Sequence, residues 1–81
     1  MLASHAIFAY PPWMRTTPVH SSTIAAIGYN GLRLRVVLNA GKTYEFDGVP
    51  NRIHEGLMAS KSKGKYFASH VRGKFPHRLI K

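Results

Sequence analysis

The residues of this 81-residue chain that could do chemistry are mainly cations, and they are concentrated toward its C-terminal end. Twelve Lys and Arg residues stand against three acids, which gives a formal net charge of +9. No acid follows Glu55, whereas seven cations lie between Lys61 and Lys81. A surface of one charge sign attracts polyanions and raises the rate of encounter with them. The composition therefore predicts an acidic partner, which is either a nucleic acid or the acidic surface of another protein.

The run Ser62-Lys63-Gly64-Lys65 is the most specific candidate site, because it stands where a helix is expected to begin. The first N–H groups of a helix have no intrahelical partner, and the helix dipole favours an anion beside them. Lysines on both sides of a glycine suit a phosphate at this position. The alternative is an ordinary, solvated junction between two helices.

A second candidate lies downstream, where cations alternate with an aromatic ring in Arg72, Lys74, Phe75, His77 and Arg78. Such mixtures bind phosphates and stack on the bases of single-stranded nucleic acids. The alternative is a C-terminal tail in which Phe75 belongs to the core and the charges are solvated. The candidate nucleic-acid or phosphate-binding residues of the two segments are Lys61, Ser62, Lys63, Gly64, Lys65, Arg72, Lys74 and Arg78.

Catalytic and metal-binding residues are not expected. The five histidines include no pair spaced four residues apart, and there is no cysteine to complete a metal site. Metal-dependent nuclease chemistry needs clustered carboxylates, and two of the three acids are expected to pair with arginines. We therefore expect a binding module without a cofactor rather than an enzyme. The lack of cysteine fits a cytoplasmic protein, and no stretch has the pattern of a membrane span or of a signal peptide.

A β-hairpin is the first of the elements that must position these cations. Thr23 to Tyr29 predicts a strand that ends at Asn30-Gly31, a strong signal for a two-residue turn. The alternation from Leu32 to Leu38 predicts a second strand with its leucines on one face. A two-residue turn places Tyr29 opposite Leu32, Ile27 opposite Leu34 and Ala25 opposite Val36.

A second hairpin follows through the loop Asn39-Ala40-Gly41, with the glycine at the left-handed position. This loop pairs Arg35 with Glu45 and Arg33 with Asp47 on one face, each pair contributing about 0.2–1 kcal/mol. On the other face it places Val36 opposite Tyr44 and Leu34 opposite Phe46. We expect both aromatic residues in the core; the alternative is a stacking platform on an open sheet.

Two helices are expected after the sheet. Pro50 suits the first turn of a helix that presents Ile53, Leu57 and Met58, and Gly56 within it would allow a close approach. A second helix is expected from Ser62 as N-cap to Arg72, with Phe67 and Val71 as its apolar stripe and Gly73 as C-cap. The fold class is therefore α+β, a three-stranded antiparallel β-meander with two helices packed on one face. This domain spans residues 18–81, and residues 1–17 form an irregular N-terminal arm.

A set of short motifs follows in order from Pro18 onward. They are Ser21-Ser22, Ile27-Gly28-Tyr29-Asn30, Tyr44-Glu45-Phe46, Gly48-Val49-Pro50, Leu57-Met58, Ser62-Lys63-Gly64, Tyr66-Phe67 and Arg72-Gly73-Lys74-Phe75-Pro76, with Ile24 and Gly41. This set resembles the KTSC domain, a small module found at the C-terminus of some lysyl-tRNA synthetases and alone in small bacterial and phage proteins. The resemblance implies the α+β fold and a suspected RNA-binding role. The central Tyr-x-Tyr of that family is here Tyr44-Glu45-Phe46, so one hydroxyl is missing, and the predicted first hairpin loop is shorter than the family's.

The function expected from the sequence is a small basic binding module that holds nucleic acid, RNA in preference to DNA, through phosphate contacts and without strong sequence readout. The alternative is a phage-type small protein that docks on an acidic surface of a host protein machine and inhibits or adapts it. The sequence makes no prediction of oligomeric state.

Overall fold

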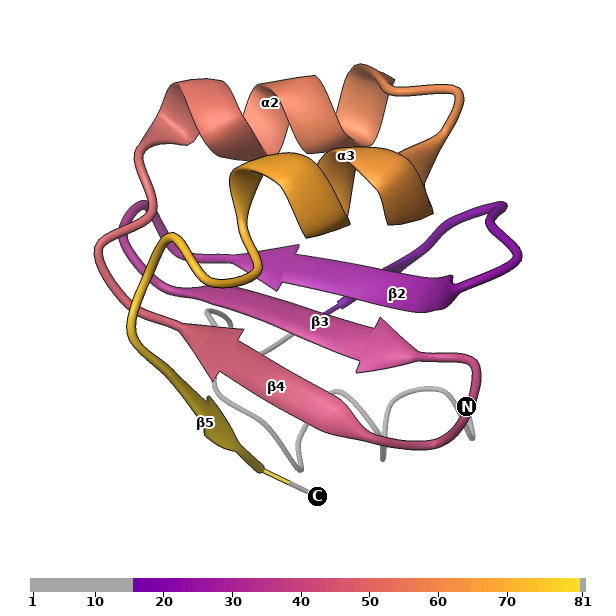
Figure 1. Cartoon of the computed structure of the whole chain (residues 1–81), viewed down its shortest axis with the longest axis horizontal. Coiled ribbons are helices and arrows are strands. Elements are labelled where there is room, and N and C mark those ends of the chain that lie inside the picture. Colours follow the sequence, from indigo (N-terminus) through magenta and orange to yellow (C-terminus); the bar gives the residue numbers. More distant parts are fainter. Residues whose placement is uncertain (1–15, 81) are drawn as a thin grey trace, which may run out of the picture.

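A computed structural model describes residues 16–80, and in this range one antiparallel sheet carries both helices on one of its faces (Figure 1). The strands are β1 (Thr17–Pro18), β2 (Ile24–Tyr29), β3 (Leu34–Leu38), β4 (Thr43–Phe46) and β5 (His77–Leu79). The helices are α2 (Asn51–Ala59) and α3 (Lys63–His70). The expected α+β fold is confirmed. Within the described range, no helix is both long and apolar enough to cross a membrane.

The sheet has five strands in the order β1-β2-β3-β4-β5 among the described residues, so the expected number of three is wrong. Both additional strands lie at the edges and are too short to show alternation. β1 has two residues, one of them proline, which cannot donate a ladder hydrogen bond; β5 has three exposed residues. β5 pairs His77 with Phe46 and Leu79 with Tyr44, so the segment after Pro76 extends the sheet. The expected arm at residues 1–17 lies outside the described residues except for Thr16 and Thr17, and Thr17 belongs to β1.

The register of β2 and β3 differs from the expected one by two residues. Tyr29 pairs with Leu34 and Ile27 with Val36, because the loop has four residues, Asn30 to Arg33. The Asn30 side-chain oxygen accepts hydrogen bonds from the N–H groups of Leu32 (3.1 Å) and Arg33 (2.7 Å). An Asx turn of this kind competes with the two-residue turn. A shift of two keeps each side chain on its face, but it leaves Leu32 in the loop and 69% exposed.

A β-bulge lies further along β2, where the register shifts between Ile24 and Ala26. The extra residue changes which side chains point to the helices. Ile24 and Ile27 are both buried, whereas Ala25, which was expected on the core face, is only half-buried. The bulge thus lets two isoleucines that are three residues apart contribute to one core.

The register of β3 and β4 is confirmed. Arg35 pairs with Glu45 and Val36 with Tyr44, and Gly41 closes the loop at a φ of 104°. Phe46 is 2% exposed and Tyr44 is half-buried, so the expectation that both belong to the core holds fully for Phe46 and partly for Tyr44.

The helices pack on the sheet through the expected apolar stripes. Ile53 and Leu57 of α2 are buried, as are Phe67 of α3 and Val71 directly after it. Ser62 occupies the N-cap position of α3, but its side chain makes no capping hydrogen bond. The helix ends at His70, slightly earlier than expected, and Gly73 follows with a φ of 78°.

Gly56 is the contact point between the two helices, and it supports a prediction on stability. A Cβ at Gly56 would overlap the Tyr66 hydroxyl and lie 2.6 Å from the ring carbon Cζ. Within a helix, glycine to alanine ordinarily stabilises by about 1 kcal/mol. Here we expect Gly56→Ala to lower the free energy of unfolding by about 1–3 kcal/mol, as overpacking does. Urea denaturation measures this change. In a Tyr66→Ala background the penalty should disappear, and a stabilising Gly56→Ala in the parent would contradict the contact.

Candidate nucleic-acid interface

Three arginines are engaged with acids on the sheet face that points away from the helices. Arg35 donates from Nε to Glu45 at 2.9 Å, and Arg33 does so to Asp47 at 2.9 Å. Arg78 of β5 contacts both acids, at 3.2 Å from Glu45 and 3.3 Å from Asp47. Glu45 is only 3% exposed and Arg35 only 8%. The structure therefore places Arg78, one of the expected phosphate-binding residues, in an ion-pair network apart from α3.

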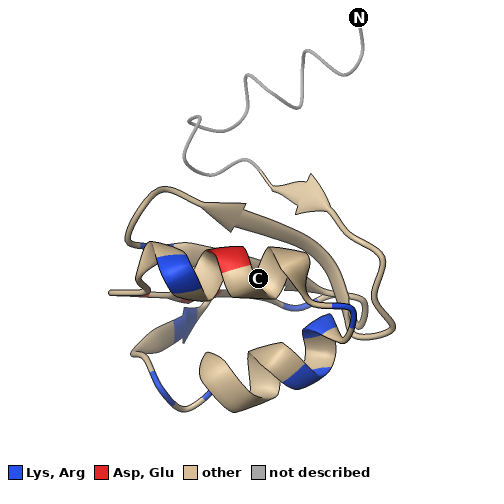
Figure 2. Ribbon diagram, turned by 90° about the horizontal axis from the view of Figure 1, so that it is seen from above, with Lys and Arg blue, Asp and Glu red and all other residues tan. Residues whose placement is uncertain are grey.

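The remaining candidate cations lie along and beside α3, and none of them has an acidic partner among residues 16–80. Within residues 16–80, the side chains of Lys61, Lys65, Arg72 and Lys74 make no hydrogen bond or ion pair. The third acid, Glu55, accepts a hydrogen bond from Asn51 at 2.9 Å on α2. Figure 2 shows Lys at the beginning of α3, Lys and Arg again on the loop that follows it, and no acid on that helix. Acids and free cations are thus segregated to different parts of the fold.

Lys63 has a structural contact that the sequence did not indicate. Its Nζ donates to the carbonyl oxygen of Ser60 at 2.7 Å, at the C-terminal end of α2. A cation at this position interacts favourably with the last carbonyls of a helix. Lys63 therefore helps join the two helices. The neighbouring Lys61 and Lys65 are the lysines whose ammonium groups remain available to an anionic ligand.

The lysines and Gly64 line a surface hollow of about 460 Å³, which we term the lysine hollow. Across from them lie Ser21, Ser22 and Thr23, the three hydroxyl residues directly before β2. The sequence interpretation missed these residues, because they stand forty positions upstream without a distinguishing pattern. Among the described residues that line the hollow, none is acidic. Its lining consists of Ser21, Ser22, Thr23, Lys61, Ser62, Lys63, Gly64, Lys65 and Ala68.

Gly64 has a packing role at the junction of α3 and the sheet. A Cβ at this position would lie 2.8 Å from the Thr23 hydroxyl oxygen, which is too close without a shift. Glycine therefore lets the first turn of α3 approach the start of β2. This approach brings the segment Ser21–Thr23 and the lysines onto the same hollow.

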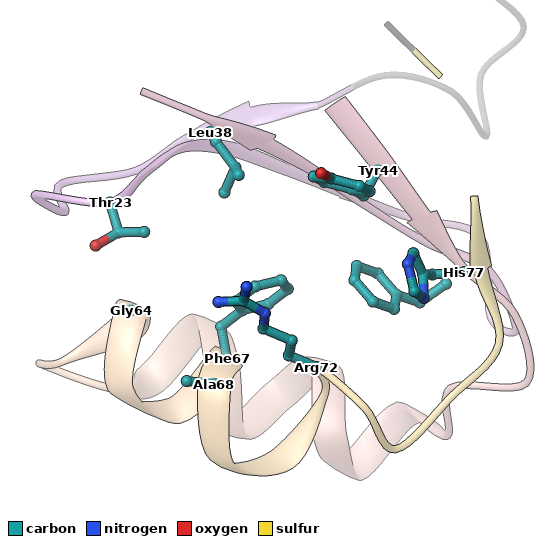
Figure 3. A pocket seen from close by; sticks show the side chains of 9 residues that line it. Thr23, Leu38, Tyr44, Gly64, Phe67, Ala68, Arg72 and His77 are labelled. Carbon is teal, nitrogen blue, oxygen red and sulfur yellow. The ribbon is translucent and has the colours of Figure 1, made fainter. Parts of the chain in front are cut away.

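A second cavity, of about 390 Å³, lies between α3 and the sheet, and we term it the aromatic cavity (Figure 3). The Phe46 ring stands 5.4 Å from that of Phe67 and 5.5 Å from that of His77, centroid to centroid. The Tyr44 ring is 5.8 Å from that of His77. Figure 3 shows Arg72 reaching from the end of α3 across Phe67 into this space. The cavity is lined by Thr23, Leu38, Tyr44, Phe46, Gly64, Phe67, Ala68, Arg72 and His77.

The two cavities adjoin one another, since Thr23, Gly64 and Ala68 line both. Along α3 and its end, Lys65, Ala68 and Arg72 follow the spacing of one helical face and connect the lysine hollow with the aromatic cavity. Of the other candidates, Lys74 lines neither cavity. Phe75 packs against the core, which was the alternative prediction for the C-terminal segment.

The stacked pair of Tyr29 and His54 is a separate aromatic cluster at the other end of the sheet, with ring centroids 4.3 Å apart. The Tyr29 hydroxyl is hydrogen-bonded to the Val49 carbonyl at 2.6 Å. Burial lowers the pKa of His54, although the neighbouring Glu55 acts in the opposite direction, and burial raises the pKa of Tyr29. These contacts join the loop before α2 to the sheet. In the part of the chain described here, no group of three His, Cys, Asp or Glu could hold a metal ion.

Comparison with known proteins identifies a matching family model and a similar solved structure. The family model of the KTSC domain matches residues 20–75, which include the lysine hollow and Arg72 but end before His77. The crystal structure of a KTSC domain protein from Yersinia pestis is similar, with 38% sequence identity and a TM-score of 0.77. That match covers 83% of this chain and 97% of the other chain. Among curated proteins, no match is found.

Proposed function

Since this chain belongs to the KTSC domain family, and since cations without an acidic partner among residues 16–80 lie along and beside α3, we propose that it is a small nucleic-acid-binding module that holds RNA through phosphate contacts. The observation that carries this proposal is the segregation of charge. The network around Glu45 and Asp47 occupies three arginines, whereas Lys61, Lys65 and Arg72 have no counter-ion within residues 16–80. Free cations on one surface are what a phosphate backbone neutralises.

The lysine hollow supports phosphate binding in particular. Lysines on one side and serine and threonine hydroxyls on the other are the groups that most often contact phosphate oxygens. Single-stranded RNA is favoured over duplex DNA because a hollow bordered by a half-open aromatic cavity suits a flexible strand with unstacked bases. Such contacts carry little sequence information, so strong sequence readout is not part of the proposal.

A binding role rather than catalysis is also part of the proposal. Each of the three acids is engaged by a neighbouring residue, two by arginines and one by Asn51, which leaves no pair of carboxylates for acid–base work in the described range. The proposal needs neither metal nor cofactor. A cytoplasmic setting, where RNA is abundant, is consistent with the lack of cysteine.

The salt dependence of RNA binding tests this function. Binding of a labelled single-stranded RNA of about ten nucleotides, a typical site size, is measured by fluorescence anisotropy over a range of salt concentrations. If Lys61, Lys65 and Arg72 each neutralise a phosphate, log Kobs should fall with log salt with a slope of about −2, since each contact contributes about 0.7 on single strands. Duplex DNA of the same sequence should bind more weakly, because its bases are stacked and paired.

Absence of binding at low salt would contradict the proposal. The phage-type alternative, docking on an acidic surface of a host protein machine, would then take its place. That alternative predicts saturation at a 1:1 ratio with a protein partner and a shallow salt slope.

A further inference from the structure

The aromatic cavity has features that phosphate binding does not explain. We propose that it takes one unstacked guanine base of the strand whose phosphates occupy the lysine hollow. This inference rests on the proposed function and adds a base-binding site to it. It is carried by the size of the cavity, its rings, its single cation and its position beside the lysine hollow.

The size and lining of the cavity suit a planar heterocycle. Its volume of about 390 Å³ falls within the range of about 300–1000 Å³ that small-molecule sites occupy. Phe46 and Phe67 are buried and form its inner wall, whereas Tyr44 is half-buried and His77 is exposed. Rings with an accessible face provide a surface on which a base can stack, and every base has such a face.

The polar groups of the cavity favour one base over others. Arg72 has a guanidinium with donors only, and it makes no ion pair or hydrogen bond with the described residues. Among the described residues that line the cavity, none is acidic. Guanine presents two neighbouring acceptors, O6 and N7, which match the guanidinium fork, whereas adenine and cytosine present an amino donor on the same edge. A donor-rich cavity with Arg72 at its mouth therefore favours guanine.

The position of the cavity connects the base to the phosphate. Thr23, Gly64 and Ala68 separate the aromatic cavity from the lysine hollow and line both, so one nucleotide can reach the two sites at once. Figure 3 shows Thr23 and Gly64 facing each other at one end of the cavity, opposite His77. The base would enter between α3 and the sheet while its phosphate stays at the first turn of α3.

The experiment uses strands that differ in one base. Each strand is a ribose-phosphate chain of about ten units, a typical site size, that has no bases except at its central position. That position carries guanine, adenine, cytosine or, in the base-free strand, nothing. With the full-length protein, we expect central guanine to raise affinity over the base-free strand by about 5- to 150-fold, the range of base–aromatic stacking. Guanine should also exceed adenine and cytosine by about fivefold or more, as bidentate recognition implies. Free guanosine monophosphate should not compete at the concentration of the strand.

Two variants test whether the aromatic cavity is responsible. Leu38→Trp fills it from the sheet, and Tyr44→Leu removes a stacking ring; both residues line this cavity and not the lysine hollow. Leu38→Trp should abolish the gain from guanine, Tyr44→Leu should reduce it, and both should leave affinity for the base-free strand unchanged. Leu32→Trp is the matched control, because Leu32 is exposed in a distant loop, and it should retain the gain. Circular dichroism verifies that each variant is folded.

The outcomes separate the two proposals. If the parent does not bind the base-free strand, the phosphate-binding function itself fails. If it binds that strand and the central guanine adds nothing, the base site alone is wrong. A gain that survives in both Leu38→Trp and Tyr44→Leu also overturns it, as does competition by free guanosine monophosphate at equal concentration.

Discussion

Replacing Lys65 and Arg72 together with glutamate is expected to lower the affinity for single-stranded RNA by about a hundredfold or more, while the domain stays folded. Hydrogen bonds to charged groups contribute about 1.5–3 kcal/mol each, so loss of two corresponds to at least about 3 kcal/mol. The reversed charges also repel the strand. Neither side chain has a partner within the described residues, and a glutamate in the first turn of α3 is favourable to the helix dipole.

The matched control is the pair Lys42→Glu and Arg52→Glu. Each double variant changes four units of charge, so the formal net charge falls from +9 to +5 in both. Lys42 and Arg52 are exposed and line neither cavity. Because neither side chain lines a cavity and salt screens charges that do not contact the ligand, the control should lose much less affinity than the Lys65 and Arg72 variant. Equal losses in anisotropy titrations of the two variants would mean that net charge, and not this surface, determines binding.

Glu45→Leu is expected to lower the free energy of unfolding by about 3–5 kcal/mol, the cost of leaving a buried charge without its partner. Arg35 is 8% exposed and would lose the carboxylate that it contacts through both Nε and an Nη. A domain of this length has a total stability of about 4–12 kcal/mol, so the variant should lose about a quarter or more of it and melt at a clearly lower temperature. Urea and thermal denaturation followed by circular dichroism measure the effect.

Two further variants test whether burial of the ion pair explains the loss of stability in Glu45→Leu. Arg35→Met combined with Glu45→Leu removes both charges and should recover most of the lost stability, as apolar replacement of buried ion pairs does. Asp47→Asn should cost about 1 kcal/mol or less, because the Asp47 side chain is 41% exposed. A Glu45→Leu variant as stable as Asp47→Asn would contradict a buried network.

Local signals along the chain were enough to predict several elements of the fold. The alternation in β3 and β4, the glycine at position 41 and the opposite charges of Arg35 and Glu45 allow one register, and that register is present. The apolar stripes of both helices and the glycine after α3 were equally readable, because helix periodicity and capping involve neighbours in the chain. The excess of cations near α3 is likewise a property of sequence order.

Other features depend on contacts between residues that are distant along the chain and meet only in the folded domain. Asn30 could close either a two-residue turn or a longer Asx loop, and the structure has the longer loop. In the same strand, a bulge allows Ile24 and Ile27 to pack under the helices. β5 has too few residues for a periodic signal and is a strand only because β4 offers it an edge. The expected pair of Arg35 and Glu45 is buried, and Arg78, thirty-three residues beyond Glu45, joins it.

The candidate site shows the same division. Lys61 to Lys65 could be selected from charge and helix position alone, but no local pattern links them with Thr23, Leu38, Tyr44 or His77. Those residues belong to four strands or strand ends, and they converge because β2, β3, β4 and β5 lie side by side beneath α3. A cavity arises where these elements leave space between them, so its lining follows from packing and not from the order of residues along the chain.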